Sequence, residues 1–503
     1  EEASAKISQH VGDISISFQL VDEKLHSYAI ALTPDDVFMV DSSTMGDWAL
    51  DPKVSKIAHD AKSLARINGL TGICFDTSLA AYLVNPGVRS QELKDIQERW
   101  GDGSAINVST PEQELLTSAR AMFTLRDSLT RELKERSLWD LFMSMELPVA
   151  DLLARMESIG IAVNKKGLDE LAAFFEGEVS RETKAAHDAV GHEFNVASPK
   201  QLQVVLFDEL GLPKTKKIKT GYTTDAESLD WLHQKSGHPV LTSLLRIRET
   251  KKLGTTVEGL IAEIEKDGRI HTHFQQTVAA TGRLSSTGPN LQNIPVRTEE
   301  GRKIRDCFTV GKGYVALLTA DYSQIEMRIM AHLSHDEKLL DAFASGEDLH
   351  ATVAGLVFGV KAAEVDPEMR RQMKAMSYGL AYGLSSYGLA IQLDISPPAA
   401  QQLMDTYFER FGGIRDYLRD VVGEARKVGY TETIMGRRRY LPDLMHDNRQ
   451  RREVAERMAL NAPIQGSAAD IIKMAMLNVQ SAIEKEKLNS RLLLQIHDEL
   501  ILE

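Results

Sequence analysis

Two cations and two aromatic rings recur every four residues, at Arg370, Lys374, Tyr378 and Tyr382. In a helix, steps of four residues return to nearly the same face, so these side chains would form one slanted stripe. A cation pair can bind phosphates, and a ring beyond it can offer its flat face to a base or a sugar. An ordinary amphipathic helix with a basic edge would show the same spacing. The stripe therefore indicates nucleotide chemistry only if other motifs support it.

Two acidic motifs each follow an apolar run. Residues 321–326 (Asp-Tyr-Ser-Gln-Ile-Glu) come after residues 314–320, which we expect to form a buried strand, and lead into a helix over 327–334. Residues 497–499 (His-Asp-Glu) lie between two apolar runs, a pattern that predicts a tight hairpin with carboxylates at its tip. A carboxylate at the end of a buried strand is costly unless it is paired or binds a cation.

Asp321 and Asp498, if two strands of one sheet bring them together, could bridge two Mg²⁺ ions. Phosphoryl transfer uses such a pair, because one ion activates the attacking oxygen and the other stabilises the leaving group. Two exposed aspartates at strand ends are the alternative interpretation, and either motif alone would leave that alternative standing.

Hydrophobic patterns divide the chain into stretches that could position these residues. Residues 1–130 mix strand-like and helical segments, and residues 140–265 are largely helical apart from a basic loop at 213–221. A turn-rich segment over 282–295 follows, and residues 346–423 are almost wholly helical.

The three motifs, in this order and with these separations, resemble those of the family A DNA polymerases, the bacterial DNA polymerase I family. Residues 321–326 are similar to the first palm motif of the family, residues 370–379 to its fingers helix, and residues 497–499 to its second palm motif. The resemblance is clear from about residue 140 to the end and weaker over the first 130 residues. It corresponds to the large fragment of these enzymes.

The resemblance implies a mixed α/β (α+β) fold of the right-hand polymerase type, preceded by an RNase H-like α/β domain of the exonuclease type. It places a degenerate 3′–5′ exonuclease-like domain at residues 1–130 and the thumb at 131–270. The fingers would comprise residues 346–423, and the palm residues 271–345 and 424–503.

The implied function is template-directed DNA synthesis in DNA repair and replication. Deoxynucleotides would be added to a primer 3′-hydroxyl by two-metal phosphoryl transfer, with release of pyrophosphate. The implied cofactors are two Mg²⁺ ions, with Mn²⁺ as an alternative. The implied partners are primer–template DNA and a dNTP, bound by a monomer that does not associate with membranes. A sliding clamp is a further candidate partner, for which the sequence carries no signal.

The resemblance assigns catalytic roles to four residues. Asp321 and Asp498 would bind the metal ions, Glu499 would help to order the site, and Lys374 would act as a general acid toward the leaving pyrophosphate. The residues implied in nucleotide binding are Arg370, Lys374, Tyr378, Tyr382, Glu326, His350 and Gln324. Those implied in DNA binding are Arg283, Asn293, Arg457, Asn461, Gln465, His497, Lys216 and Lys217. Structural roles remain open for His350 as a helix-start histidine, for His497 as a turn histidine, and for the trio at 457, 461 and 465 as a polar helix surface.

Glu326 and Tyr378 are the residues that the resemblance links to sugar selection. Glu326 would occupy the space that a ribose 2′-hydroxyl needs, so deoxynucleotides would be favoured by exclusion. Some family members have Phe where this chain has Tyr378, and those with Tyr accept dideoxynucleotides more readily. We therefore expect weak discrimination against chain terminators.

The first 130 residues lack the acidic residues that a proofreading domain needs. In the family, an Asp-x-Glu on the first strand and a Tyr-x-x-x-Asp on a later helix help to hold two metals, and neither pattern occurs here. Leu64 stands about where another aspartate would be, and residues 119–122 (Ala-Arg-Ala-Met) stand where the last motif would be. Without carboxylates the metals have no ligands, so the sequence predicts a structural remnant without exonuclease activity.

Composition agrees with this interpretation without leading to it. A chain of 503 residues should contain two or more domains. Two cysteines, the lack of a long apolar run and the lack of a signal peptide indicate a soluble protein of a reducing compartment. The resemblance implies that this compartment is the bacterial cytoplasm, at the nucleoid. Because the chain begins with Glu1 rather than Met, we expect a fragment or processed product. It stops at Glu503, whereas members of the family it resembles continue for several tens of residues with a further palm strand and helix.

The net charge of −13 argues against a nucleic-acid partner only if local charge is ignored. Basic residues cluster in the loop with Lys214, Lys216, Lys217 and Lys219, and again at 437–439 and 449–452. A solvated surface would explain each cluster, but beside the three motifs we expect these clusters to face DNA.

Two other functions compete with DNA synthesis. A related single-subunit RNA polymerase would share both aspartates and the Arg-Lys-Tyr helix, but Glu326 argues against it because such an enzyme must leave room for a 2′-hydroxyl. A non-catalytic DNA-binding scaffold would not need Asp321 and Asp498, which are both present. Comparing dNTP with rNTP incorporation, and testing for any incorporation, separates the three.

Overall fold

The structure is a computed structural model that describes residues 2–88, 90–101, 110–295 and 298–503. It divides into two compact units, each assembled from separate parts of the chain. The first unit comprises residues 1–158, 274–285 and 318–502, and the second comprises residues 159–273, 286–317 and 503. None of the helices within the described ranges combines the length and the apolarity that a membrane crossing requires.

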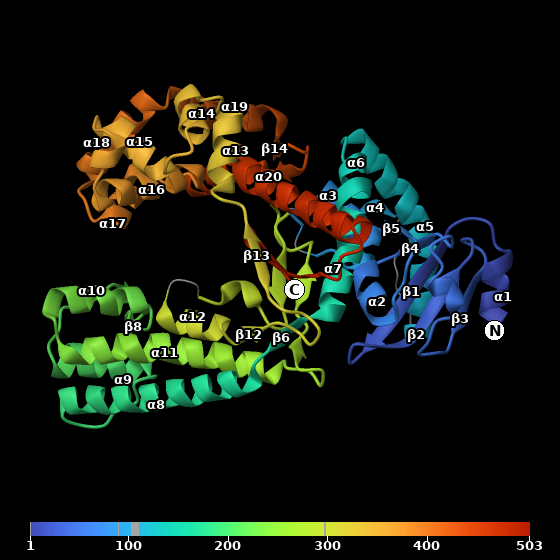
Figure 1. The fold of residues 1–503 in the computed structure, drawn as a ribbon, viewed down its shortest axis with the longest axis horizontal. Coiled ribbons are helices and arrows are strands. Elements are labelled where there is room, and N and C mark those ends of the chain that lie inside the picture. The colour runs from blue at the N-terminus through green and yellow to red at the C-terminus, as the bar shows by residue number, and fades with distance from the viewer. Residues whose placement is uncertain (1, 89, 102–109, 296–297) are drawn as a thin grey trace. The chain divides into compact units, whose positions relative to one another are not determined.

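The first unit opens with a five-stranded mixed sheet in the order β3-β2-β1-β4-β5 (Figure 1). Its β1–β2 and β2–β3 pairs are antiparallel, whereas β1–β4 and β4–β5 are parallel. The strands are β1 (Ile14–Val21), β2 (Lys24–Ala31), β3 (Val37–Val40), β4 (Lys56–Ala58) and β5 (Ile73–Asp76). The helices of this domain are α1 (Glu2–Gln9), η1 (Asp47–Ala49), α2 (Ala61–Asn68), α3 (Thr77–Val84), α4 (Leu93–Trp100) and α5 (Pro111–Glu135).

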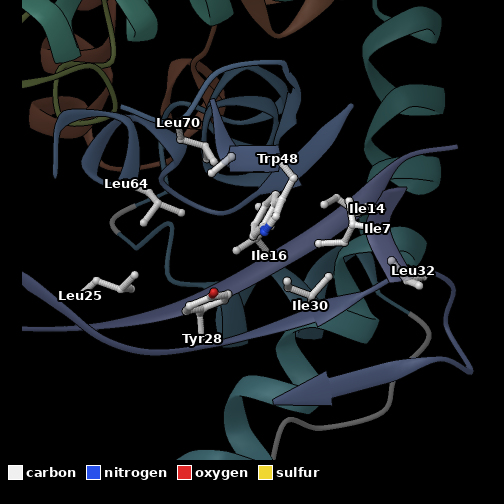
Figure 2. Close-up of a cluster of buried hydrophobic side chains, with 11 residues drawn as sticks. Ile7, Ile14, Ile16, Leu25, Tyr28, Ile30, Leu32, Trp48, Leu64 and Leu70 are labelled. Atoms are coloured by element: carbon white, nitrogen blue, oxygen red, sulfur yellow. The ribbon is translucent and has the colours of Figure 1, made fainter. Parts of the chain in front are cut away.

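Alternation along β1 gives this sheet its apolar core. Ile14 and Ile16 point to one face, where they join side chains of β2 and the Trp48 ring, as Figure 2 shows. The Tyr28 and Trp48 rings lie 6.4 Å apart between centroids. The opposite face carries Ser15, whose hydroxyl donates to the carbonyl of Ala119 in α5. This side is covered by α5, which packs against β1 and β2.

The remainder of the first unit is mostly helical and contains a small antiparallel sheet in the order β13-β17-β16. Its strands are β13 (Leu318–Asp321), β16 (Leu492–Ile496) and β17 (Glu499–Leu502), and a separate ribbon pairs β14 (Tyr430–Glu432) with β15 (Arg438–Tyr440). The short strands β10 (His273–Gln275) and β11 (Ser285–Thr287) lie at the limits of the segment 274–285. The helices are α6 (Trp139–Leu141), the π-helical η2 (Phe142–Glu146), α7 (Leu147–Ile159), α13 (Ile325–Ser334), α14 (Glu337–Ala344), α15 (Leu349–Phe358), η5 (Ala362–Glu364), α16 (Pro367–Ala381), α17 (Ser386–Leu393), α18 (Pro397–Arg410), α19 (Gly412–Val428), η6 (Pro442–Met445) and α20 (Arg449–Lys485).

Two long helices dominate the second unit. These are α8 (Lys165–Val190) and α11 (Pro239–Ala262), which run side by side in Figure 1 and pack along their lengths. A small sheet has the order β12-β6-β9. The other elements are β6 (Ile161–Val163), α9 (Pro199–Gln203), the π-helical η3 (Val204–Glu209), β7 (Lys217–Ile218), β8 (Gly221–Tyr222), α10 (Ala226–Ser236), β9 (Arg269–Ile270), η4 (Leu291–Asn293), α12 (Glu299–Arg305) and β12 (Phe308–Thr309).

The strand predicted before Asp321 is exposed rather than buried. Residues 314–320 were expected to form a buried strand, but β13 begins only at Leu318 and all four of its residues are exposed. Val315 is 99% exposed and Leu318 61% exposed. The physical reason is position in the sheet: β13 is an edge strand that pairs with β17 alone, so an apolar run does not by itself guarantee burial.

Candidate active site

The His-Asp-Glu motif forms the predicted hairpin. Ile496 at the end of β16 pairs with Glu499 at the start of β17, which leaves His497 and Asp498 as the turn. His497 has φ of 52°, a left-handed conformation that a two-residue hairpin turn requires. The Gln495 amide donates to the carbonyl of His497 and holds the turn from the strand side.

Strand pairing brings the two motif aspartates together. Asp321, the last residue of β13, lies opposite Glu499 in the antiparallel ladder with β17. One residue further on, the amide of Tyr322 donates to the carbonyl of Asp498 at 3.1 Å. The ladder and this hydrogen bond confirm the expectation that two strands of one sheet present Asp321 and Asp498 at the same edge.

Neighbouring acidic groups affect the pKa of the Asp498 carboxyl. Burial raises the pKa of Asp498, and the negative charges of Glu326 and Asp321 raise it further, while Arg283 and His497 oppose them. Such crowding of negative charge favours a bound cation, and carboxylate oxygens are the ligands that Mg²⁺ prefers.

The donor set fits Mg²⁺ held jointly by protein and substrate. In the described part of the chain, no three His, Cys, Asp or Glu side chains come close enough to hold a metal ion among themselves. Mg²⁺ is commonly bound by one or two carboxylates, with water and substrate phosphates completing its shell. Asp321 and Asp498 together match that pattern.

Glu326 lies at the centre of a polar cluster beside the aspartates. It is 6% exposed, in the first turn of α13. The Arg283 guanidinium forms an ion pair with its carboxylate. The Tyr382 hydroxyl donates to the same carboxylate, at 2.8 Å to Oε2 and 3.1 Å to Oε1. Burial and the Glu326 charge raise the pKa of Tyr382 to about 12, so this phenol remains a donor. Gln324 caps the helix with a left-handed φ of 56°.

The predicted cation–aromatic stripe lies on α16. Pro367 occupies its first turn and the Asp366 side chain caps it, while Tyr382 directly follows the last helical residue. The Arg370 guanidinium binds the Asp348 carboxylate in a two-point ion pair, with N–O distances of 2.7 and 3.1 Å. This partner was not predicted from the sequence, although Asp348 is only two positions before His350.

Lys374, in contrast, is exposed on α16 and makes no hydrogen bond or ion pair with any described residue. It stands one turn beyond Arg370 toward the rings. Its ammonium group is therefore available to an anionic ligand, whereas the Arg370 guanidinium must first leave Asp348.

Tyr378 and His350 pack ring against ring. Their centroids lie 5.8 Å apart, and His350 is buried at the start of α15. Its Nδ1 atom is buried without a hydrogen-bond partner. Burial lowers the pKa of His350, and the positive charges of Arg370 and Lys374 act in the same direction against Asp348. Burial and the nearby charges of Glu326, Asp498 and Asp321 raise the pKa of Tyr378.

The polar trio Arg457, Asn461 and Gln465 lies on one face of α20, as the four-residue spacing predicted. Arg457 is exposed and the other two are half-buried, whereas neighbouring positions such as Ala459 and Ala462 are buried. The face is accessible to a ligand that runs along the helix. Gly383 approaches α20 here in a left-handed conformation, and a Cβ at Gly383 would lie 2.9 Å from Cγ of Arg457.

Three of the predicted DNA-binding residues belong to the second unit. Lys216 and Lys217 are exposed in a loop that carries the short β7–β8 ribbon, and Asn293 ends η4. The structure therefore does not gather the whole predicted set in the unit that holds Asp321 and Asp498.

The cluster at 437–439 was expected to face DNA, and for Arg437 this is wrong. Arg437 is 3% exposed, and its guanidinium pairs with Glu146 and Asp470 inside the first unit. Arg438 pairs with Glu432 and lies over the Tyr430 ring. The sequence does not distinguish the three consecutive arginines. In the structure the first of them is buried because it pairs with acidic residues from distant parts of the chain.

The positions discussed for an exonuclease site carry no acidic side chain. Leu64, a residue of α2, is fully buried in the cluster of Figure 2. Ala119 and Met122 are buried in α5, and Arg120 between them is exposed. Ser15 and Ser17 occupy the α5-facing positions of β1 and carry no charge.

Comparisons with known proteins identify the family of this chain. Residues 165–503 match the family model described as DNA polymerase family A. DNA polymerase I of Mycobacterium tuberculosis is 54% identical over 494 residues, covering 94% of this chain and 54% of the relative. DNA polymerase I of Bacillus subtilis is 40% identical over 527 residues, covering 99% of this chain and 59% of the relative.

Among solved structures, a similar chain is described as the "POL domain of Pol1 from M. smegmatis complex with DNA primer-template and dNTP". It superposes with a TM-score of 0.94 at 52% identity, covering 100% of this chain and 91% of that one. The chain thus spans about half the length of the curated relatives that it matches.

Proposed function

Because this chain belongs to DNA polymerase family A, as the three sequence motifs predicted, we propose that it catalyses template-directed DNA synthesis with release of pyrophosphate. The observation that carries the proposal is the pairing of β13 with the β16–β17 hairpin, which supports a joint metal site of Asp321 and Asp498. The proposed arrangement is a right hand, with thumb, palm and fingers at residues 131–270, 271–345 with 424–503, and 346–423.

Asp321 and Asp498 are the proposed ligands of two Mg²⁺ ions. When bound, these ions would acidify the primer 3′-hydroxyl and neutralise charge on the triphosphate. Glu499, opposite Asp321 in the ladder, orders the edge strand that carries the first ligand. The Asp498 carboxylate, whose pKa is raised by burial and by its acidic neighbours, gains most from a cation.

The proposed triphosphate contacts are Lys374, Arg370 and His350. Lys374 is free to bind an anion and to give its proton to the departing pyrophosphate. Arg370 would exchange the Asp348 carboxylate for phosphate oxygens as the nucleotide enters. His350, whose pKa is lowered by burial, would donate one neutral N–H.

Glu326 and Tyr378 are the proposed sugar-selecting pair. Arg283 and Tyr382 hold the Glu326 carboxylate from two sides, so it cannot easily move away from a ribose 2′-hydroxyl. The Tyr378 phenol remains protonated because burial raises its pKa, and it would replace the hydrogen bond that a dideoxynucleotide lacks. Gln324, two residues before Glu326 at the N-cap position of α13, is a further proposed nucleotide contact.

The related M. smegmatis structure is described with primer-template DNA and a dNTP, and we propose both as partners of this chain. Arg283 would probe the minor groove at the primer end, where purine N3 and pyrimidine O2 acceptors occur in every correct pair. His497 would support the primer terminus from the hairpin turn. The further proposed contacts are Arg457, Asn461 and Gln465 on α20 and Lys216, Lys217 and Asn293 of the second unit.

We further propose that the domain at residues 1–130 has no 3′–5′ exonuclease activity. Residues 1–130 lack the Asp-x-Glu and Tyr-x-x-x-Asp patterns, and buried Leu64 and residues 119–122 stand where further metal-binding carboxylates would be needed. Trimming of 3′-labelled single-stranded DNA in Mg²⁺, retained in an Asp321→Asn variant, would contradict the proposal.

Primer extension tests the main proposal. Wild-type protein with a primed template, dNTPs and Mg²⁺ should extend the primer, and Asp498→Asn should reduce extension by about 10³-fold or more while still binding primed DNA. Asp151→Asn serves as the matched control, because Asp151 is a partly exposed aspartate that pairs with Arg155 on the same helix, α7. Extension with rNTPs in place of dNTPs would favour an RNA polymerase, and DNA binding without any extension would favour a scaffold.

A further inference from the structure

We propose that Tyr82, in the N-terminal domain, is a positioning residue for the Arg283–Glu326 pair and thereby for sugar selection. The proposal rests on the polymerase function proposed above. It gives the N-terminal domain a task that does not need exonuclease carboxylates. The connection runs through the segment Ala279–Arg283, which Tyr82 contacts at one end and which carries Arg283 at the other.

Tyr82 makes one specific polar contact with this segment. Its side chain is fully buried at the C-terminal end of α3, and its hydroxyl donates to the carbonyl of Ala279 at 2.6 Å. The two residues are 197 positions apart, so the contact is purely tertiary. Burial raises the pKa of the phenol to about 12, which keeps the hydroxyl protonated as a donor.

The same carbonyl closes a tight turn. The amide of Gly282 donates to the carbonyl of Ala279 at 3.1 Å, so Ala279 accepts from the turn and from Tyr82 together. Gly282 has φ of +85°, a conformation that side chains rarely adopt. Arg283 directly follows this glycine. A shift of the Ala279 carbonyl would therefore pass into the backbone that carries the Arg283 guanidinium.

A buried ionic cluster holds the other side of the turn. Arg437 pairs with Glu146 and Asp470, and Lys473 pairs with Glu146 at 2.7 Å, so two positive and two negative groups balance one another. All four are at most 3% exposed. A Cβ at Gly282 would lie 2.5 Å from Nε of Arg437, which shows how closely the guanidinium covers the turn.

Glu146 also anchors the start of the segment. The Gln276 amide donates to its carboxylate at 2.8 Å and to its backbone carbonyl at 3.0 Å. The path to Arg283 is thus fixed at Gln276, at Ala279 and at Gly282. Removing the Tyr82 hydroxyl changes no buried charge and takes away no partner of the Glu146 carboxylate.

The consequence falls on the Glu326 carboxylate. Arg283 and Tyr382 are the two groups that hold it, and Tyr382 belongs to the segment after α16, which would move if the fingers close. Arg283 is then the support that stays in place, and the position of its guanidinium depends on the Ala279–Gly282 turn. A looser turn should therefore weaken the selection of dNTPs over rNTPs. It should have little effect on the stability of the fold.

Tyr82→Phe tests this inference, with Tyr28→Phe as the matched control. Tyr28 is a buried tyrosine of the same domain, and its hydroxyl donates to the carbonyl of Thr44 at 3.3 Å within the core of Figure 2. Each change removes one buried hydroxyl and keeps the ring. We expect similar small losses in melting temperature, but a three- to tenfold smaller dNTP-over-rNTP ratio of kcat/KM in Tyr82→Phe only, about the size of one hydrogen bond.

Hydrogen exchange provides a readout that does not need polymerase activity. The amide of Gly282 should exchange faster in Tyr82→Phe than in the wild type or in Tyr28→Phe. If the wild type fails to extend primers, the proposed function is wrong. The exchange rate of the Gly282 amide would still show whether the Tyr82 hydroxyl holds the turn. An unchanged dNTP/rNTP ratio with unchanged exchange, or equal effects of both substitutions, would overturn the inference.

Discussion

At the scale of single residues, some charged groups of the candidate active site are paired with groups of opposite charge and others are not. Glu326 is satisfied by Arg283 and Tyr382, whereas Asp498 is left with a raised pKa by burial and by neighbouring carboxylates. Lys374 has no partner among the described residues. Groups left in this state are those that a charged substrate and its cations would complete.

Replacing Glu326 by Ala should admit ribonucleotides. The change opens the space that the carboxylate fills and leaves Arg283 and Tyr382 in place, so the dNTP-over-rNTP ratio of kcat/KM should fall by about 10- to 200-fold. Single-nucleotide incorporation measures the ratio. Glu337→Ala, an exposed carboxylate in the first turn of α14, should leave it unchanged, and equal ratios in all three proteins would refute the assignment.

Replacing Tyr378 by Phe should strengthen rejection of chain terminators. The ring and its packing on His350 are kept, but the hydroxyl that would compensate for a missing 3′-hydroxyl is lost. Incorporation of a ddNTP relative to the dNTP should fall by about tenfold, the value of one hydrogen bond in a shielded site. A wild-type protein that already rejects ddNTPs strongly would contradict this view of Tyr378.

At the scale of elements, α15 and α16 are connected by one two-point ion pair. Asp348 caps α15 through its hydrogen bond to the amide of Ala351, and it also binds Arg370 from α16. The Arg370 hydrogen bonds lower the pKa of Asp348, so the pair persists at neutral pH. The pair therefore competes with any phosphate that Arg370 is to bind.

An Asp348→Asn variant should bind nucleotides more tightly. Asn is also a good N-cap, so α15 should persist, while Arg370 loses its charged competitor. Because exposed ion pairs are worth about 0.2–1 kcal/mol, the KM for dNTP should fall by about 1.5- to 5-fold. Steady-state kinetics measure it. A raised KM would mean that Asp348 helps Arg370 to bind rather than competing with it.

At the scale of the whole molecule, the first unit contains both the N-terminal domain and all residues around Asp321 and Asp498. Within it, the cluster of Glu146, Arg437, Asp470 and Lys473 joins η2, the residues before β15, and α20. Although burial acts to raise it, Lys473 and Arg437 lower the pKa of Glu146 to about 2. The cluster therefore couples the stability of this unit to pH.

Acid should destabilise the first unit through Glu146. The unfolded carboxyl binds a proton near its ordinary pKa of 4.5, whereas the folded one stays ionised down to about 2. The stabilisation is thus complete above pH 4.5 and is lost as the pH falls toward 2, with a full value on the order of 3 kcal/mol. Urea unfolding between pH 6 and 3 should show a shallower pH dependence for Glu146→Gln than for the wild type. Equal slopes would exclude this contribution.

Short-range patterns determined much of this protein from the sequence alone. The stripe at 370–382 and the hairpin at 497–499 depend on residues close together in the chain, so spacing and residue type sufficed. The order of three such motifs also identified the family, which the family model confirms. The missing carboxylates of the N-terminal domain were equally visible without a structure.

Only the tertiary structure decided which groups are partners. Arg437 and Arg438 are neighbours in the sequence, yet Glu146, 291 positions away, buries the first, and the second pairs locally with Glu432. The exposure of β13, the Asp348 competitor of Arg370 and the Tyr82–Ala279 contact were likewise invisible. Burial and pairing depend on elements that meet only when the chain folds, because an ion pair or a hydrogen bond is set by distance in space rather than by separation in the sequence.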